Sequence, residues 1–247
     1  MELRHDVLDV DTPDGPMAIL VTQPADDGPY PTVVIFHDAP AIRQAIRDFM
    51  AKLAGEGYRV ATPDLYHRAG RMIGFEPDAV AADPSLRDQM VTLLYSLTDD
   101  GIQRDLDATL GALDLADDEL LGTIGFCLGA RAVVRTLTRL PDRFGAGATW
   151  HPSFLADDGD DSPHLTAADI ARPLYIGIGT ADQVQSIAMH QPFFDAVEPL
   201  EHVEVEIFDG ADHGFTWPGY ATYHQVASDT CFAKTTALFA RHLSAGR

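Results

Sequence analysis

The chain has 247 residues, of which 46% are hydrophobic and 22% are charged, a composition typical of a globular protein. It carries 17 Lys and Arg against 38 Asp and Glu, which gives a formal net charge of −21. Nucleic-acid binding needs a basic surface, and an anionic membrane repels an acidic one. The charge therefore argues against both kinds of partner.

The two cysteines, Cys127 and Cys231, form no CxxC pair and are too few for a disulfide scaffold. The first 15 residues carry charges where a signal peptide has an apolar core. The longest apolar runs are also far shorter than a membrane span. We therefore expect a soluble, cytoplasmic protein, either a monomer or a homodimer.

Short β-branched runs alternate with helical stretches along the chain. The periodicity predicts a hairpin (3–10 and 17–23), a buried strand (32–36), a helix (41–56), a strand (58–62), a helix (102–116), and further strands or helices at 120–126, 128–140, 144–150, 173–179, 185–197, 203–208 and 222–243. This alternation is typical of an α/β fold with a mostly parallel central sheet and helices on both faces. Since no linker or repeat is visible, we expect a single domain over residues 1–247.

Two stretches are less regular. Residues 65–101 are a candidate cap over the carboxyl ends of the strands. Residues 156–161 are strongly acidic and are interpreted as a solvated loop, with cation binding as the weaker alternative. Because ligands of open parallel sheets bind beyond the carboxyl ends of the strands, candidate functional residues are sought there.

Cys127 occupies the clearest local motif, Gly125-Phe126-Cys127-Leu128-Gly129, between a predicted strand and a predicted helix. A nucleophile at such an elbow needs small neighbours because the chain turns tightly. The adjacent helix N-terminus favours the thiolate. A buried structural cysteine is the alternative, but the strand–turn–helix context favours a nucleophile.

Asp182 and His213 each follow another predicted strand, in the segments GTADQV and GADHGF. Alone, Asp182 could be a helix N-cap and His213 an ordinary loop histidine. The chain order Cys127, Asp182, His213, however, is the nucleophile–acid–base order of α/β-hydrolases. In that arrangement the histidine transfers the proton and the aspartate orients the imidazole.

The segments GFCLG, GTADQV and ADHGF, together with the stretch from Val33 to Arg68 that includes PDLY, resemble the dienelactone hydrolase family over roughly residues 30–245. The resemblance implies a single α/β-hydrolase domain with a catalytic triad of Cys127, Asp182 and His213. It also implies an oxyanion hole from the backbone N–H groups of Leu128 and Ala39, with Asp38 next to the nucleophile. The activity expected is hydrolysis of a small ester or lactone through an acyl-thioester.

The departures from the family pattern concern the substrate. Well-known members bind the substrate carboxylate through arginines, one of them four residues after the catalytic histidine, where this chain has Trp217. Losing a charge-assisted bond costs about 1.5–3 kcal/mol, so dienelactone itself is not the expected substrate. The run after Asp38 also differs from the family's Ile-Phe-Gly, since it is Ala-Pro-Ala.

Several further residues are candidates for substrate binding. Trp217 and Phe215 could form an apolar acyl pocket or simply pack the core. His151, in a His-Pro-Ser segment that resembles one branch of the family, could line the pocket or be structural. Arg68 could replace the missing arginine or lie on the surface.

Other functions remain as alternatives. A catalytically silent small-molecule-binding homologue would keep the fold without turnover. Thiol redox chemistry lacks a nearby resolving cysteine. No HExxH or clustered Cys/His pattern indicates a metal, and no GxGxxG or Walker pattern indicates a nucleotide, so neither metal nor cofactor is expected.

Overall fold

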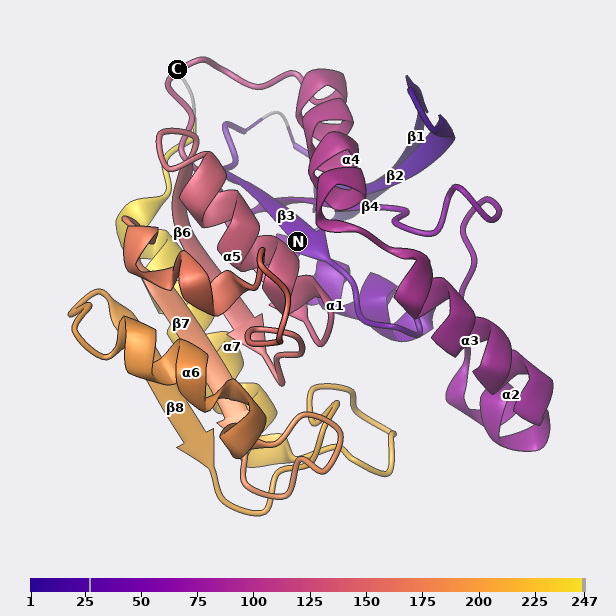
Figure 1. The fold of residues 1–247 in the computed structure, drawn as a ribbon. Helices are drawn as coiled ribbons and strands as arrows, with labels where there is room; N and C mark the ends of the chain where they lie inside the picture. Colours follow the sequence, from indigo (N-terminus) through magenta and orange to yellow (C-terminus); the bar gives the residue numbers. More distant parts are fainter. Residues whose placement is uncertain (27, 246–247) are drawn as a thin grey trace. The chain divides into compact units, whose positions relative to one another are not determined.

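The structure is a computed structural model that describes residues 1–26 and 28–245 (Figure 1). The chain forms two compact units, Met1–Glu119 with Ser244–Arg247, and Leu120–Leu243. Each unit contains four strands that pair with one another. The expectation of a single domain over residues 1–247 stays a prediction.

The first unit begins with the predicted hairpin. Its elements are β1 (Leu3–Thr12), β2 (Gly15–Pro24), β3 (Thr32–Phe36), α1 (Gln44–Ala54), β4 (Arg59–Pro63), α2 (Pro77–Ala82), α3 (Pro84–Ser96) and α4 (Asp99–Ala112). The strand order is β1-β2-β4-β3, antiparallel except for the parallel pair β3/β4. Gly15 closes the hairpin with a φ of 114°, a conformation open to glycine and rare for other residues.

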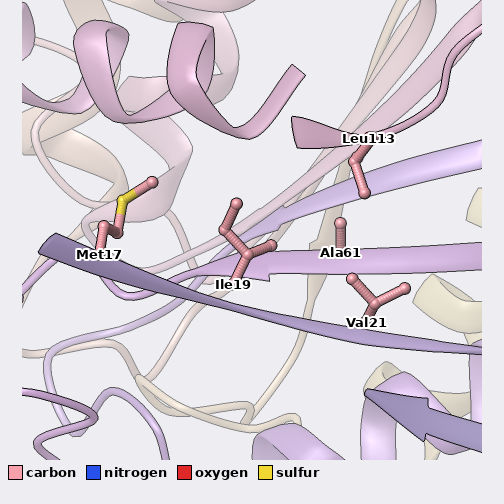
Figure 2. Close-up of a cluster of buried hydrophobic side chains, with 5 residues drawn as sticks. All are labelled: Met17, Ile19, Val21, Ala61 and Leu113. Carbon is pink, nitrogen blue, oxygen red and sulfur yellow. The ribbon is translucent and has the colours of Figure 1, made fainter. Parts of the chain in front are cut away.

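Alternate residues of β2 build one part of the core. Met17, Ile19 and Val21 form a buried cluster with Ala61 of β4 and Leu113, which follows α4 (Figure 2). Because side chains alternate across a strand, these three residues share one face of β2. The hairpin is therefore anchored by apolar packing on this face.

The second unit consists of regular strand–helix alternation. Its elements are β5 (Leu121–Phe126), α5 (Gly129–Arg139), β6 (Phe144–Trp150), two short 3₁₀ turns (Pro163–Leu165 and Ala167–Asp169), β7 (Leu174–Gly179), α6 (Ile187–Val197), β8 (Val203–Phe208) and α7 (Gln225–His242). The order is β5-β6-β7-β8, and all three pairs are parallel.

Helices cover both faces of these parallel strands (Figure 1). A Cβ at Gly147 would lie 2.8 Å from Leu137 of α5, so glycine allows this helix to pack closely. On the other face of β6, the Trp150 indole N–H donates to Thr235 of α7 over 3.1 Å. The predicted α/β class, mostly parallel strands and two-sided helical cover are thus confirmed.

Residues 65–101 are more regular than the sequence suggested. They contain α2, α3 and the first turn of α4, which begins three residues earlier than predicted. Pro77 and Pro84 stand in the first turns of α2 and α3, where proline costs no backbone bond. The Asp83 side chain caps α3 by accepting from Ser85 N. Among residues 1–26 and 28–245, no helix has both the length and the apolar character needed to cross a membrane.

Candidate active site

Cys127 lies at the sharp turn between β5 and α5, as predicted. Its φ of 52° is in the left-handed region, which is uncommon for a residue other than glycine. At Gly125, a Cβ would lie only 2.2 Å from the Gly129 carbonyl oxygen, so the elbow requires glycine there. Cys127 N donates to Trp150 O over 3.3 Å. The local sequence therefore produces a strained elbow that presents the thiol beside the start of a helix.

Asp182 binds His213 through one oxygen and its own loop through the other. Its Oδ2 accepts from His213 Nδ1 over 2.7 Å. Its Oδ1 accepts from the backbone N–H groups of Val184 and Gln185, at 3.0 and 2.7 Å. The N-cap of α6 is Ser186, so the alternative that Asp182 is merely a helix N-cap is wrong. The three bonds hold the carboxylate rigidly against one ring nitrogen.

The second ring nitrogen of His213, Nε2, is the one that does not bind Asp182. Its Nε2 is buried and, within the part of the chain that the structure describes, accepts and donates no hydrogen bond. Burial by itself lowers the pKa of this ring, but the negative charge of Cys127 and the hydrogen bond with Asp182 outweigh burial and raise that pKa to about 10. Within the second unit, Asp182 and Cys127 thus both lie close enough to His213 to change the pKa of its ring.

The predicted substrate-binding rings form a buried cluster around His151, which also contacts the ring of His213. The ring of His151 meets the rings of His213 and Phe215 edge-on, each at 5.2 Å between centroids. Trp217 packs on Phe126 at 4.8 Å. Because Trp217 is 2% exposed and Phe215 is fully buried, both pack the core beside the His151 ring in this conformation. His151 also bonds Thr216 Oγ1 through Nε2, at 2.9 Å.

Three polar residues near Cys127 and Asp182 were missed by the sequence analysis. The Ser153 hydroxyl lies 3.3 Å from Cys127 Sγ. Gln185 Oε1 accepts from Phe154 N over 3.1 Å, and His190 Nε2 bonds the Pro152 carbonyl over 3.0 Å. The segment His-Pro-Ser was noticed only for its histidine. Gln185 and His190 carry no recognisable motif, since only folding brings α6 and its preceding loop to residues 152–154.

In the first unit, Asp38 is held by a buried arginine. Its two carboxylate oxygens accept from Arg43 Nη1 and Nη2 over 2.6 and 2.8 Å. Next to it, His37 donates from Nδ1 to Asp38 O and accepts from Leu65 N, which fixes a neutral tautomer. Burial keeps the pKa of His37 below its usual value. The roles expected for Asp38 and Ala39 beside the nucleophile stay predictions.

Arg68 is already occupied by carboxylates. Its guanidinium bonds both oxygens of Asp105 at 2.8 Å and Asp14 Oδ2 at 2.7 Å. Asp105 also accepts from His67 Nε2 at 3.1 Å. In this conformation Arg68 connects α4 to the hairpin turn, and it is not available to a substrate carboxylate.

The acidic stretch at residues 156–161 forms ion pairs with an arginine of α5. Arg131 of α5 forms ion pairs with Asp157 at 2.6 Å and Asp161 at 3.6 Å. The acidic loop is therefore held to α5 by this arginine.

Outside residues 27, 246 and 247, no three His, Cys, Asp or Glu side chains are grouped as metal ligands.

The chain is similar to known proteins over nearly its whole length. The model of the dienelactone hydrolase family matches residues 17–243. The carboxymethylenebutenolidase of Rhodococcus opacus is 26% identical over 238 residues, which cover 90% of this chain and 85% of that protein. A Synechocystis protein provisionally named carboxymethylenebutenolidase is 29% identical over 237 residues, with 90% and 91% covered.

Solved structures show the same fold. A Klebsiella pneumoniae protein provisionally named dienelactone hydrolase has a TM-score of 0.81 at 23% identity, with 98% of this chain and 100% of that one covered. A dienelactone hydrolase-like promiscuous phosphotriesterase from metagenomic libraries has a TM-score of 0.72 at 19% identity, with 97% and 99% covered. With the family match over residues 17–243, these results show that the chain belongs to the dienelactone hydrolase family and is a hydrolase of that kind.

Proposed function

We propose that this hydrolase cleaves a small ester or lactone, with Cys127 as nucleophile, His213 as acid and base, and Asp182 as the group that orients His213. The observation that carries the proposal is the 2.7 Å bond from His213 Nδ1 to Asp182. That bond directs the unpartnered Nε2 away from the carboxylate, and the nearby thiol lies at a strained elbow. The same division of roles defines nucleophile–histidine–acid triads in general.

Acylation begins from the thiolate–imidazolium pair, in which the negative charge of Cys127 raises the pKa of His213. The Cys127 sulfur forms a bond to the carbonyl carbon, and the carbonyl π electrons move to oxygen. When the tetrahedral intermediate collapses, the C–O bond to the leaving alkoxide breaks and His213 Nε2 donates its proton to that oxygen. The product is an acyl-thioester and neutral His213.

Deacylation reverses the direction of proton transfer. Neutral His213 takes a proton from water as the water oxygen bonds to the thioester carbon. The C–S bond then breaks, the carboxylic acid leaves, and the thiolate–imidazolium pair is restored. Asp182 stays ionised throughout and stabilises the imidazolium.

We propose that the backbone N–H of Leu128 forms part of the oxyanion site, for which the family resemblance also implies Ala39. Leu128 is the N-cap of α5, directly after the nucleophile, where helix N–H groups lack intrahelical acceptors. Removing one such donor from an oxyanion hole typically costs about 2.7–4 kcal/mol of transition-state stabilisation. The assignment of Ala39 rests on the family resemblance alone.

The substrate proposed is an uncharged ester or lactone, not dienelactone itself. The residue four positions after His213 is the buried Trp217, which cannot pair with a carboxylate. On a matched pair of lactones we expect the neutral one to have the higher kcat/KM, by at least tenfold for a lost bond of about 1.5–3 kcal/mol. An equal or reversed preference would contradict this substrate class.

The nucleophile is tested with the two cysteines of the chain. Cys127→Ala should abolish hydrolysis of an activated acetate ester, whereas Cys231→Ala should keep it, since Cys231 is fully buried and burial raises the pKa of its thiol to about 12. Mass spectrometry of rapidly quenched enzyme should locate the acyl group on Cys127. Turnover that survives in Cys127→Ala would refute the proposal.

A further inference from the structure

We propose that Ser153 is a positioning residue for the nucleophile, whose hydroxyl donates a hydrogen bond to the Cys127 sulfur and holds it as a thiolate in its reactive place. This inference rests on the proposed function, in which Cys127 attacks the substrate. Nothing in the triad requires a serine here, and none of the residue roles assigned above uses its hydroxyl.

Two contacts bind Ser153 to the nucleophile. Its hydroxyl oxygen lies 3.3 Å from Cys127 Sγ, and its backbone N–H donates to the Cys127 carbonyl over 2.9 Å. Ser153 is only 1% exposed, so water does not compete for the hydroxyl. A thiolate can only accept a hydrogen bond, which makes the hydroxyl the donor in the charged state. Hydrogen bonding to the charged form of a group favours that form.

The loop that carries Ser153 is strained. His151 and Phe154 have φ values of 40° and 60°, in the left-handed region that costs a non-glycine residue of order 1–3 kcal/mol. Such conformations persist only where surrounding contacts impose them. One left-handed residue stands on each side of Pro152 and Ser153. We infer that this backbone shape serves to place the Ser153 side chain.

The contacts that impose this shape come from α5, α6 and the loop before α6. His190 Nε2 donates to Pro152 O at 3.0 Å, Phe154 N donates to Gln185 Oε1 at 3.1 Å, and Arg131 Nη1 donates to Phe154 O at 3.4 Å. Burial lowers the pKa of His190, which keeps this ring neutral. The backbone is therefore held on both sides of the serine.

The same loop contacts connect the serine to the acid. Gln185, whose side chain holds Phe154, donates its own backbone N–H to Asp182 Oδ1 over 2.7 Å. Asp182 in turn binds His213. The geometry thus joins the acid and the nucleophile through residues 182–185 and 151–154, in addition to their link through the imidazole.

Other charged and titratable groups around this loop could also shift the pH at which the Cys127 thiol ionises. They come from each element packed against it: Arg131 of α5, Asp182 after β7, His190 of α6, His213 after β8, and His151 in the loop itself. A substitution at Ser153 changes none of these charges. Any change in the thiol titration can therefore be assigned to the hydroxyl.

The test measures alkylation of Cys127 by iodoacetamide against pH, which reports the thiolate without requiring turnover. Cys231 does not interfere, because it is fully buried. For Ser153→Ala we expect the alkylation midpoint to rise by about one pH unit, the size expected for one hydrogen bond to a charged group. Below that midpoint, kcat/KM for an activated ester should fall about tenfold. Ser153→Thr, which keeps a hydroxyl, should restore much of both.

Ser228→Ala is the matched control, since this buried serine of α7 donates to the Thr216 carbonyl. It should leave the alkylation midpoint unchanged. An unchanged midpoint and rate in Ser153→Ala, or a wild-type thiol that resists alkylation at every pH, would overturn the inference. Neither result would contradict the proposed function, because the Cys127→Ala test of that function measures turnover and not thiol ionisation.

Discussion

Within residues 1–26 and 28–245, each compact unit has a histidine hydrogen-bonded to a buried aspartate, and the two pairs differ at the second ring nitrogen. In the first unit, His67 Nε2 meets Asp105 at 3.1 Å and its Nδ1 meets the Pro16 carbonyl at 3.2 Å. In the second, His213 Nδ1 meets Asp182 at 2.7 Å and its Nε2 meets no hydrogen-bonding partner among the residues described. The side chain of His213 is 15% exposed, whereas that of His67 is 1% exposed.

The comparison supports the proposal that the pair in the second unit, and not the one in the first, takes part in acid–base chemistry. Both ring nitrogens of His67 are used inside the protein, and Asp105 is shared with Arg68. The histidine therefore connects β2, the segment after β4, and α4. In His213, one nitrogen is fixed by Asp182 and the other remains for a proton. An unsatisfied buried nitrogen is costly for folding, and such costs concentrate at functional sites.

The largest expected effect comes from truncating each histidine in the same way. His213→Ala should lower kcat for ester hydrolysis by about 10²–10⁴-fold, the usual contribution of a general acid–base group, with little change in thermal unfolding. His67→Ala should keep kcat within a few-fold but lower the free energy of unfolding by about 1.5–3 kcal/mol, because it removes a hydrogen bond to the buried Asp105 carboxylate. Equal losses of activity in the two variants would break the distinction.

A second prediction concerns the buried ion pair of the first unit. Arg43→Met leaves the Asp38 carboxylate without its main cation, and both side chains are almost fully buried. Removing one partner of a buried pair costs about 3–5 kcal/mol. Urea denaturation should show this loss, and Asp38→Asn in the same chain should recover part of it. A loss within 0.5 kcal/mol, roughly the range of an ordinary surface substitution, would show that the pair is not structural.

The third prediction uses the pH dependence of the second unit. The negative charge of Cys127 and the hydrogen bond with Asp182 outweigh burial and raise the pKa of His213 to about 10. The imidazolium that protonates the leaving group is lost as pH rises through that value, so kcat/KM should fall on the alkaline side. In Asp182→Asn this decline should begin at lower pH, with a smaller maximum. An unchanged alkaline limb would show that the aspartate does not hold the proton on His213.

The smallest effect is expected at the loop beside the nucleophile. Gln185→Ala removes the acceptor of Phe154 N and should lower kcat/KM by about 2–12-fold, equivalent to a net hydrogen bond of about 0.5–1.5 kcal/mol. Gln191→Ala, on the exposed side of α6, is the control and should have no effect, since the Gln191 side chain bonds the exposed Asp195. Equal kcat/KM values for the two variants would show that Gln185 does not contribute to the site.

Local sequence patterns predicted most of the fold. The apolar run at 32–36 and the alternating run at 203–208 form β3 and β8 with the predicted bounds, because a short, strongly patterned run folds as a strand in many contexts. Residues 65–101 were misjudged as irregular. Their helices α2 and α3 begin at prolines and bury few residues, so they show weak apolar periodicity.

The candidate site, like the fold, was predicted in part from the sequence. Cys127, Asp182 and His213 were predicted from their places after three strands, since the carboxyl ends of parallel strands converge at one edge of a sheet. Arg68 was a tentative substrate ligand, yet its guanidinium is bound by Asp14 and Asp105, which are distant from it in sequence. Sequence spacing predicts which elements form but not which distant carboxylate an arginine will meet.

The sequence by itself determined the α/β class and the family, and it led to the proposed order of nucleophile, acid and base, because these depend on periodicity and on short motifs within single strand–loop–helix units. Only the tertiary structure decided which histidine–aspartate pair is closed and which is open, and that Ser153 lies against Cys127. Those facts depend on contacts between residues 26 to 51 positions apart. Such contacts are made by packing whole elements together, and no local pattern encodes them.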